Sequence, residues 1–392
     1  PTTISAVKQY LKPKEVLIFI HTAENQSYVW AIPYNSKIKF LKSKIDKKRV
    51  TQIVKHLREI LAPDPQTLGD IPEFDFKQAY ELYSELLKPI EIVWKDATDL
   101  IIVASEPLGQ LPFGILPVSP INTQKMENVL FENYRKIPWL IREVSITRQP
   151  SAASFVTLRS LPKGNPGRKA FAGFGDPIFN QQQLSQVEEE GVKQIATTVL
   201  GKTIQVRGIR ITDTGNLDSN TITSSRIDML NRLPDTAEEI KSIAKALDAD
   251  PTADIFLGRQ ASEGRVKSMD LSDRRVLVFA THALVPKDLD GLDQPALALC
   301  SPEISEENED GLLTLGEILK LKLNADWVVL SACNTGASAG AGAEAVSGLG
   351  RAFFYAGTRA ILVSMWPVET TSARELTTGL FQYQKAEPAL SR

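Results

Sequence analysis

Two short apolar runs in the second half of the chain each end in a residue that can take part in chemistry. Residues 275–282 are Arg-Val-Leu-Val-Phe-Ala-Thr-His, and residues 326–333 are Asp-Trp-Val-Val-Leu-Ser-Ala-Cys. Runs this short, rich in β-branched residues and apolar at almost every position, are typical of strands buried on both faces of a parallel sheet. The pattern therefore predicts two buried parallel strands, one ending at His282 and the other at Cys333.

The rest of the second half alternates between apolar runs and segments with helical periodicity. Residues 180–230 are polar with weak periodicity, and they predict a loop-rich insertion. Regular alternation of strands and helices is the pattern of a parallel sheet covered by helices, so we expect an α/β fold. The further strands are expected at residues 169–175, 295–300 and 359–364. The helices are expected at residues 235–247, with Asp235 as the N-cap, at residues 261–269, from Thr314 onward, and at residues 343–356 and 370–382.

The first half carries an α/β pattern of its own. Residues 161–168 are rich in Pro and Gly and are the best candidate for a linker. The pattern therefore divides the chain into an N-terminal α/β unit with its linker, residues 1–165, and a second domain, residues 166–392. Strands are expected at residues 15–21, 27–32, 37–41 and 99–104, and helices at residues 46–61, with Asp46 as the N-cap, and 76–87.

Composition narrows the range of partners. The 392 residues are 43% hydrophobic and 23% charged, with a net charge of -2, as in ordinary globular proteins. This charge gives no electrostatic reason to expect nucleic acid or an anionic membrane as a partner. No apolar stretch reaches the roughly 18 residues needed to span a bilayer. Two cysteines form neither a disulfide framework nor a zinc cluster, so we expect no metal and no cofactor.

The two predicted strand ends suggest nucleophilic catalysis. In open parallel sheets the chemistry lies just beyond the carboxyl ends of the strands. There an imidazole can take the proton of a thiol, and the thiolate can attack a carbonyl. His282 precedes Cys333 by 51 residues, and caspases place their histidine about 50 residues before their cysteine. The local signature differs, because Ser331-Ala332 precedes the cysteine where caspases have Gln-Ala.

Two other nucleophiles compete with Cys333. The run Gly336-Ala-Ser338-Ala-Gly340 matches the G-x-S-x-G elbow of esterases, but that fold needs a histidine after the serine, and no histidine follows Ser338. Cys300 ends the strand predicted after His282, but Pro302 follows it and no tight glycine turn is present. We therefore interpret Cys300 as a buried structural residue.

Two glycine-containing stretches do not complete a nucleotide-binding motif. Residues 173–175, Gly-Phe-Gly, lack a third glycine and an opening helix, and Gly201-Lys-Thr203 lacks the earlier glycine of a P-loop because position 196 is Ala. Asp176 follows the first stretch, and we interpret it as a residue that orders a tight turn.

Four segments of the second half, together with one in the first, stand in an order and spacing that resemble a known family. The segments are residues 279–282, 311–318, 323–335 and 342–357, with residues 108–117 in the first half. They resemble the bacterial CHAT domain, a caspase-like peptidase domain that is related to separases and caspases and often follows tetratricopeptide repeats.

The resemblance implies a caspase-like fold, with a parallel-rich sheet flanked by helices and preceded by a second, pseudo-caspase-like α/β unit. It implies that His282 is the catalytic histidine and Cys333 the nucleophile of a cysteine endopeptidase. The backbone N–H groups of Cys333 and of Ala283, which stands where the family often has Gly, are then the expected oxyanion donors. A protein or peptide substrate and upstream tetratricopeptide repeats follow as partners, with no nucleic acid and no membrane.

The resemblance also bears on location and completeness. A nucleophilic thiol needs a reducing setting, so we expect a cytoplasmic protein. Such domains continue past a position like Arg392, and the chain starts at Pro1 without a signal-peptide pattern. We therefore expect a peptidase domain that is truncated at its C-terminus and cut from a longer protein.

Related peptidases bind the residue before the scissile bond beside the strand that follows the helix after the cysteine. Here that strand ends at Ser364-Met365-Trp366, and Glu344 begins the helix after Cys333, so we expect these four residues to bind substrate. Two alternatives stay open: Trp366 as an ordinary core residue, and Glu344 as a stabiliser of the helix N-terminus.

One alternative function and one dynamic expectation complete the predictions. A caspase-like module that binds partners without turning over substrate is the main rival of the peptidase. Residues 311–318 and 336–342 flank the expected site, and we expect both to be mobile loops that order on binding of substrate or activator.

Overall fold

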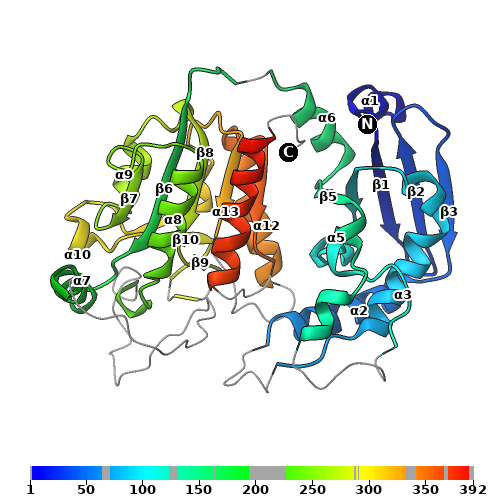
Figure 1. Ribbon diagram of the computed structural model, residues 1–392, viewed down its shortest axis with the longest axis horizontal. Coiled ribbons are helices and arrows are strands. Elements are labelled where there is room, and N and C mark those ends of the chain that lie inside the picture. Colours follow the sequence, from blue (N-terminus) through cyan, green and yellow to red (C-terminus); the bar gives the residue numbers. More distant parts are fainter. Residues whose placement is uncertain are drawn as a thin grey trace. The chain divides into compact units, whose positions relative to one another are not determined.

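The structure is a computed structural model of the 392-residue chain, and it divides into two compact units, Pro1–Pro162 and Lys163–Arg392. The division falls within the Pro- and Gly-rich stretch at residues 161–168. In Figure 1 the colours follow the sequence, so unit 1 is drawn from blue to green and unit 2 from green to red. The structure describes residues 2–63, 71–122, 131–162, 164–193, 227–286, 288–289, 291–331, 341–365 and 370–387.

Unit 1, residues 1–162, is built on a five-stranded mixed sheet in the order β3-β2-β1-β4-β5. β1 and β2 form the predicted antiparallel hairpin, β3 extends it, and β4 and β5 run parallel to β1. α2 and α3 cover one face of the sheet, and α1 and α6 pack on the other. The elements are β1 Glu15–Thr22, β2 Ser27–Pro33, β3 Lys39–Ser43, β4 Asp99–Ala104, β5 Ser145–Arg148, α1 Ile4–Tyr10, α2 Lys47–Leu61, α3 Phe76–Leu86, α4 Glu91–Trp94, α5 Leu140–Glu143 and α6 Ala152–Ser160.

Unit 2, residues 163–392, is built on a five-stranded sheet in the order β13-β12-β8-β6-β7, and every pair in it is parallel. The first two strands of this sheet in chain order, β6 and β7, lie to one side of β8, and the last two, β12 and β13, lie to the other. The strand order therefore reverses between β6 and β8, which is where ligands bind in sheets of this kind. The strands are β6 Lys169–Pro177, β7 Ile255–Gly258, β8 Arg274–Ala280, β12 Trp327–Leu330 and β13 Ile361–Val363.

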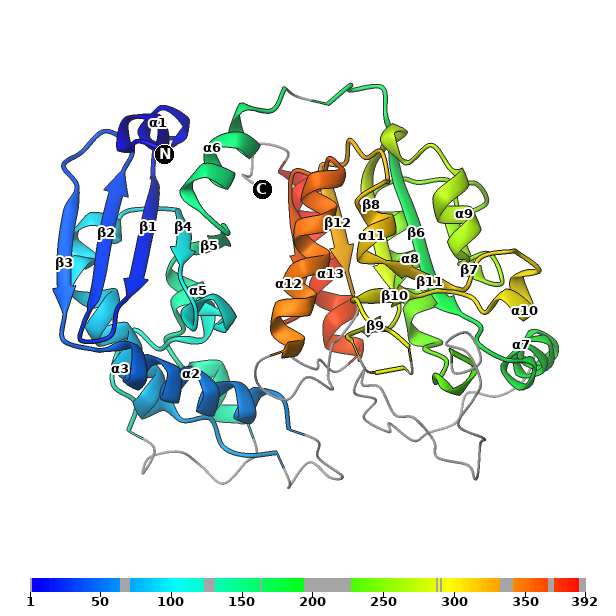
Figure 2. The same cartoon turned by 180° about the vertical axis from the view of Figure 1, so that it is seen from behind.

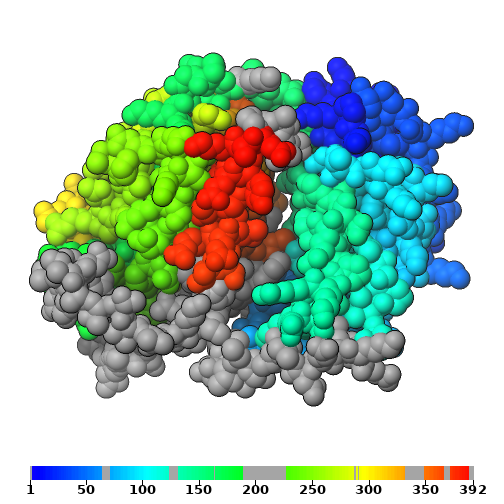
Figure 3. Space-filling model, viewed as in Figure 1, coloured from blue at the N-terminus to red at the C-terminus, as the bar shows by residue number. Residues whose placement is uncertain are grey.

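Helices cover both faces of this parallel sheet. α8 and α13 pack on one face, which Figure 1 shows, and α9, α11 and α12 pack on the other, which Figure 2 shows. α13, drawn in red, is exposed on the face of unit 2 that Figure 3 shows. The predicted fold class, an α/β chain with a helix-flanked parallel sheet and a second α/β unit, is confirmed. The helices are α7 Gln181–Lys193, α8 Asp235–Ala246, α9 Glu263–Ser268, α10 Pro302–Ser305, α11 Leu315–Ile318, α12 Ala341–Ala356 and α13 Thr370–Ala386.

The Gly-Phe-Gly stretch at the end of β6 serves close packing. A Cβ atom on Gly173 would lie 2.6 Å from a ring carbon of Phe171 and 2.8 Å from a side-chain carbon of Ile240 in α8. A Cβ atom on Gly175 would lie 2.8 Å from another carbon of the Ile240 side chain. Cβ atoms essentially never come this close to other atoms, so both glycines are needed for α8 to rest on β6.

A small antiparallel sheet, β11-β10-β9, corrects two expectations. The strand expected at residues 295–300 exists as β10, Ala296–Ala298, but it pairs with β9, Ala283–Leu284, and β11, Leu312–Thr314, outside the parallel sheet. The loop expected at residues 311–318 is wrong, while the helix expected from Thr314 is confirmed as α11. Residues 312–314 form β11, because Leu312 and Leu313 are buried, and Thr314 and Glu317 form a capping box that starts α11.

Two further expectations are changed in part. The loop-rich insertion expected at residues 180–230 begins with a regular helix, α7, and residues 194–226 lie outside the described part. The loop expected at residues 336–342 lies outside the described residues up to 340, and residues 341–342 open α12. Among the described helices, none is both long and apolar enough to cross a membrane.

Candidate functional site

His282 lies at the corner between the parallel sheet and the small antiparallel sheet. β8 ends at Ala280, and β9 begins at Ala283, directly after the histidine. The carbonyl of His282 accepts a hydrogen bond from the Ala298 N–H at 2.9 Å, and the Thr281 hydroxyl donates to the Ala298 carbonyl. These bonds fix the backbone on both sides of the imidazole, whose residue is only 3% exposed.

The imidazole of His282 has a defined tautomer. Its Nε2 atom lies 2.7 Å from the carbonyl oxygen of Asn231. A carbonyl oxygen can only accept a hydrogen bond, so Nε2 carries the proton, and Nδ1 holds the lone pair in the neutral ring. The ring of Phe179 packs against the imidazole with 5.7 Å between ring centres.

Burial also sets the charge of His282. Removal from water lowers the pKa of the imidazole below its ordinary value of 6.5, and the hydrogen bond to the Asn231 carbonyl only partly opposes this. The ring is therefore neutral at pH 7, with Nδ1 ready to accept a proton. A neutral, oriented imidazole is what a general base requires.

The Asn231 carbonyl was not foreseen from the sequence. It belongs to the segment 227–234, which leads into α8. Side chains from the start of α7 hold the beginning of this segment: the Asn180 amide donates to the Asp228 carbonyl at 2.6 Å, and the Gln183 amide donates to the Leu230 carbonyl at 2.7 Å. Every residue has a backbone carbonyl, so no sequence pattern could have identified this one as the acceptor for His282.

Cys333 lies outside the described residues, as does Ser338. The strand that leads toward the cysteine is described up to Ser331. β12 pairs with β8 in a parallel register that ends with Leu330 beside Phe279, and the Ser331 N–H donates to the Phe279 carbonyl at 2.9 Å.

A buried carboxyl group supports the end of β12. Glu239 of α8 is 0% exposed. It accepts a hydrogen bond from the Ser331 hydroxyl at 2.9 Å and another from the Thr377 hydroxyl of α13, also at 2.9 Å. Glu239 thus ties together α8, the end of β12 and α13.

The other predicted site residues are described only in part. Ala283 is buried and pairs with Leu297 in the antiparallel sheet. It is not among the described non-glycine residues with a positive φ, so its backbone is compatible with an alanine. Ser364 and Met365 follow β13 directly and are half-buried. The backbone of Glu344 lies in α12, but its side chain is outside the described part, as is all of Trp366.

Cys300 has the properties of a structural cysteine. It is buried, its thiol donates to the Ser301 carbonyl at 3.7 Å, and burial raises the pKa of the thiol to about 12. Because the thiolate is the reactive form, such a thiol is inert at neutral pH.

The acidic residues 306 and 307 bind at the start of α9 and just before it. Glu306 pairs with Arg259 at 3.0 Å. Glu307 accepts from the Ser262 hydroxyl and from the Gly264 N–H at the start of α9. These contacts hold the loop against the start of α9.

One carboxylate cluster in the described part has the spacing of a metal site. Oxygens of Glu263, Glu309 and Glu317 lie within 4.8 Å of one another. The ammonium group of Lys267 contacts all three, at 3.2, 2.5 and 3.1 Å. The lysine supplies the positive charge that a cation would otherwise bring, so we assign this cluster a structural role.

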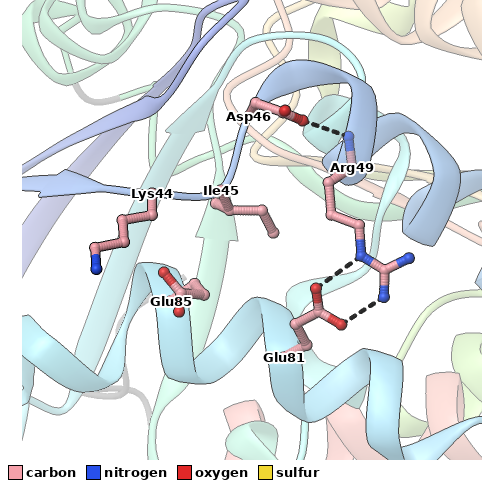
Figure 4. Close-up of a pocket in the computed structure, with 6 residues that line it drawn as sticks. All are labelled: Lys44, Ile45, Asp46, Arg49, Glu81 and Glu85. Carbon is pink, nitrogen blue, oxygen red and sulfur yellow. Dashed lines mark hydrogen bonds and ion pairs between the residues drawn. The ribbon is translucent and has the colours of Figure 1, made fainter.

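A surface pocket of about 330 Å³ lies in unit 1, and Figure 4 shows the residues that line it. The guanidinium of Arg49 faces Glu81 through two hydrogen bonds of 2.8 and 2.6 Å, and Asp46 caps α2 by accepting from the Arg49 N–H. The remaining lining residues are Lys44, Ile45 and Glu85. Glu85 accepts a hydrogen bond from the Ser43 hydroxyl at 2.8 Å. The pocket contains none of the predicted site residues.

Comparison with known families gives one finding. A family model described as the CHAT domain matches residues 77–392, which covers all of unit 2 and the part of unit 1 from α3 onward. The comparison with curated proteins returned no match.

Proposed function

The chain belongs to the CHAT domain family, which has a caspase-like fold and is related to cysteine peptidases, and we propose that it is a cysteine endopeptidase. In this proposal Cys333 is the nucleophile and His282 the base. The helix-flanked parallel sheet of unit 2 is the caspase-like part. Unit 1 acts as an inactive α/β partner of the catalytic unit.

The register of the parallel sheet is the observation that carries the proposal. The last described pair joins Phe279 of β8 to Leu330 of β12. His282 and Cys333 each stand three positions further along their segments. The sequence separation of the two residues therefore equals the offset of the strands, 51 residues. A dyad at neighbouring strand ends would produce this coincidence, and an unrelated His and Cys would produce it only by chance.

The state of His282 gives independent support. The ring is buried and neutral, and its Nε2–H is directed to the Asn231 carbonyl. This leaves Nδ1 as the nitrogen that can take a proton from a thiol. The carbonyl thus plays the orienting part that a third group plays in a catalytic triad.

The reaction follows from these assignments. His282 Nδ1 takes the thiol proton as the sulfur of Cys333 attacks the scissile carbonyl, and a C–S bond forms. The oxyanion accepts hydrogen bonds from the backbone N–H groups of Ala283 and Cys333. The imidazolium then gives its proton to the leaving amine, the C–N bond breaks, and a thioester remains. Water, deprotonated by His282, hydrolyses the thioester and releases the thiol.

The substrate pocket is proposed beside the end of β13. β13 pairs with β12 in parallel, and the last described pair joins Leu330 to Val363. Trp366 stands three positions beyond Val363, as Cys333 does beyond Leu330. We infer a partly apolar pocket of Ser364, Met365 and Trp366 for the residue before the scissile bond, with Glu344 near its entrance.

The acidic residues Glu306, Glu307 and Glu309 give no support to a pocket that requires a basic residue, because they bind Arg259 and two residues of α9, Gly264 and Lys267. A reactive thiol further suggests a reducing compartment such as the cytoplasm. Substrate proteins and upstream tetratricopeptide repeats are the proposed partners.

Alkylation of the full chain with iodoacetamide tests the dyad. The chain has two cysteines, and Cys300 is buried with a thiol pKa near 12, so modification reports on Cys333. We expect the rate to rise with pH at a point well below the roughly 8.5 of a free thiol. Cys333→Ala should abolish modification, Cys300→Ala should leave it unchanged, and His282→Ala should return the rate profile to that of a free thiol.

Cleavage of a positional peptide library tests the activity itself, with Cys333→Ala as the control. Cleavage that survives in this variant would refute the assigned nucleophile. A wild-type alkylation profile like that of a free thiol, with no cleaved peptide, would instead favour the non-catalytic caspase-like scaffold.

A further inference from the structure

An ion pair at the end of β6 lies next to the acceptor of His282. The guanidinium of Arg232 donates from Nε to one carboxylate oxygen of Asp176 at 2.8 Å and from Nη2 to the other at 2.7 Å. Both side chains are nearly buried, with 13% and 7% exposed. A two-bonded Arg–carboxylate pair fixes orientation as well as distance, and it is stronger when water is excluded.

The backbone of Asp176 is itself held in place. Its φ of 49° lies in the left-handed region, which Asp tolerates better than most residues. Its N–H donates to the Thr236 hydroxyl at 2.7 Å, and that hydroxyl donates to the Leu233 carbonyl, also at 2.7 Å. The end of β6 therefore holds the segment 231–236 through two side chains, the Thr236 hydroxyl and the Arg232 guanidinium.

The ends of two neighbouring strands, β6 and β8, thus contact two consecutive residues, Arg232 and Asn231. β6 and β8 are paired, with Gly175 beside Ala280. The residue after Gly175 binds the Arg232 side chain, and the residue two beyond Ala280, His282, binds the carbonyl of Asn231. Movement of Arg232 would displace the carbonyl that precedes it in the chain.

We propose that the Asp176–Arg232 ion pair is a positioning device that holds the Asn231 carbonyl against His282 and so keeps the proton on Nε2. This inference rests on the proposed function, because it concerns the base of the proposed dyad. Without the ion pair, the segment keeps its anchors at Asp228, Leu230 and Thr236 but loses the two hydrogen bonds of the Arg232 side chain to Asp176. The imidazole can then take either tautomer, and Nδ1 is no longer reserved for the thiol.

Asp176→Asn is the decisive variant. It removes the charge but keeps the size of the side chain and a residue that accepts a positive φ. Asp254→Asn is the matched control, because Asp254 pairs with Arg274 at 3.3 Å in the same sheet, with both side chains 7% exposed, at the opposite end of β8. Arg232→Lys keeps the cation but not the two-bonded geometry, and it decides the question if Asp176→Asn does not fold.

The first measurement is the nitrogen-15 spectrum of labelled histidine in the full chain, which distinguishes the two tautomers. The chain has three histidines, and His282→Gln assigns the signal. We expect one Nε2–H tautomer in the wild type and in Asp254→Asn, and a mixture in Asp176→Asn and Arg232→Lys. A single unchanged tautomer in the folded ion-pair variants would overturn the inference, whatever the activity of the protein.

The second measurement is iodoacetamide alkylation of Cys333 as a function of pH. We expect Asp176→Asn to lower the rate near pH 7 by about tenfold or more and to move the inflection toward that of a free thiol. Asp254→Asn should keep the wild-type profile. A wild-type profile in Asp176→Asn would also overturn the inference. A wild-type chain that already alkylates like a free thiol would refute the proposed dyad instead, and the tautomer spectrum would still decide on the ion pair.

Discussion

Glu239 offers a quantitative test of how the end of β12 is held. Its carboxyl group is fully buried and accepts two hydroxyl hydrogen bonds of 2.9 Å, from Ser331 and Thr377. In Glu239→Ala the Thr377 hydroxyl keeps an alternative, because the Ala373 carbonyl also lies 2.9 Å away. Of these two hydrogen bonds, the one from Ser331 is then lost without replacement, at about 1.5–3 kcal/mol. With about 1 kcal/mol more for the space left behind, we expect a loss of about 2–4 kcal/mol in the free energy of unfolding.

The competing expectation comes from desolvation. A buried ionised carboxyl group pays for its removal from water, so its replacement by an apolar residue can be neutral or even stabilising. The sign of the change therefore decides which effect is larger at this position. Glu239→Gln keeps the shape and can still accept one hydroxyl, so we expect a loss of about 1 kcal/mol or less.

The assay is thermal and urea unfolding of the full chain, with Glu238→Ala as the matched control. Glu238 is the neighbouring residue on the same helix, its side chain is 57% exposed, and it pairs only with Lys241 among the described ion pairs. Its replacement should change stability by less than about 0.5 kcal/mol. Equal unfolding curves for the Glu238 and Glu239 variants would refute the view that the buried carboxyl group holds β12 to α8 and α13.

Three further predictions follow. Burial, and after it the charge of Glu317, raise the pKa of Glu263 from 4.5 to about 8. The contribution of the protonated Glu263 to stability is therefore complete below pH 4.5 and is lost as the pH rises through 8. Glu263→Gln should flatten the fall in melting temperature between about pH 5 and 9, and an unchanged slope would contradict this. Gly173→Ala would bring its Cβ to 2.6 Å from a ring carbon of Phe171 and to 2.8 Å from Ile240, and urea unfolding should show a loss of about 1–3 kcal/mol; an unaltered midpoint would mean that the Phe171 ring and α8 adjust without a cost in stability. Trp366→Ala should lower turnover and shift the preferred residue before the cut in a peptide library, while the melting temperature stays close to that of the wild type; unchanged kinetics on every peptide would disprove the pocket.

The strands that carry the proposed dyad could be predicted because their patterns are strong. β8 and the segment around β12 are continuous apolar runs, and burial on both faces requires this in a parallel sheet. β7, with four residues, and β5, also with four, were missed. Both are edge strands, and only one of the four residues of β7 is buried and none of β5. A strand this short and this exposed leaves too few apolar positions to define a period.

Local rules failed where long-range contacts decided the outcome. Asp235 was expected to cap α8, but it is the first helical residue, and Pro234 is the N-cap without a side-chain hydrogen bond. The hydroxyl of the next residue, Thr236, instead binds the backbone of Asp176. Asp176 was interpreted as a turn residue, and its positive φ agrees with this, but its ion pair with Arg232 spans 56 positions. No spacing rule connects residues that only the fold brings together.

The burial of His282 determines what a pH profile of this site would report. An ion pair of thiolate and imidazolium requires a positive charge on a ring that is 3% exposed, and burial lowers the pKa of that ring below 6.5. The carbonyl of Asn231 favours the charged ring, but this effect is smaller than that of burial. For the proposed dyad we therefore expect a neutral thiol and a neutral imidazole at rest, with the proton moving as the sulfur attacks. The alkylation rate then rises where the imidazole becomes neutral, so the inflection belongs to His282 rather than to Cys333. This is why a change at Asp176, which is proposed to act through the Asn231 carbonyl, is expected to move the inflection.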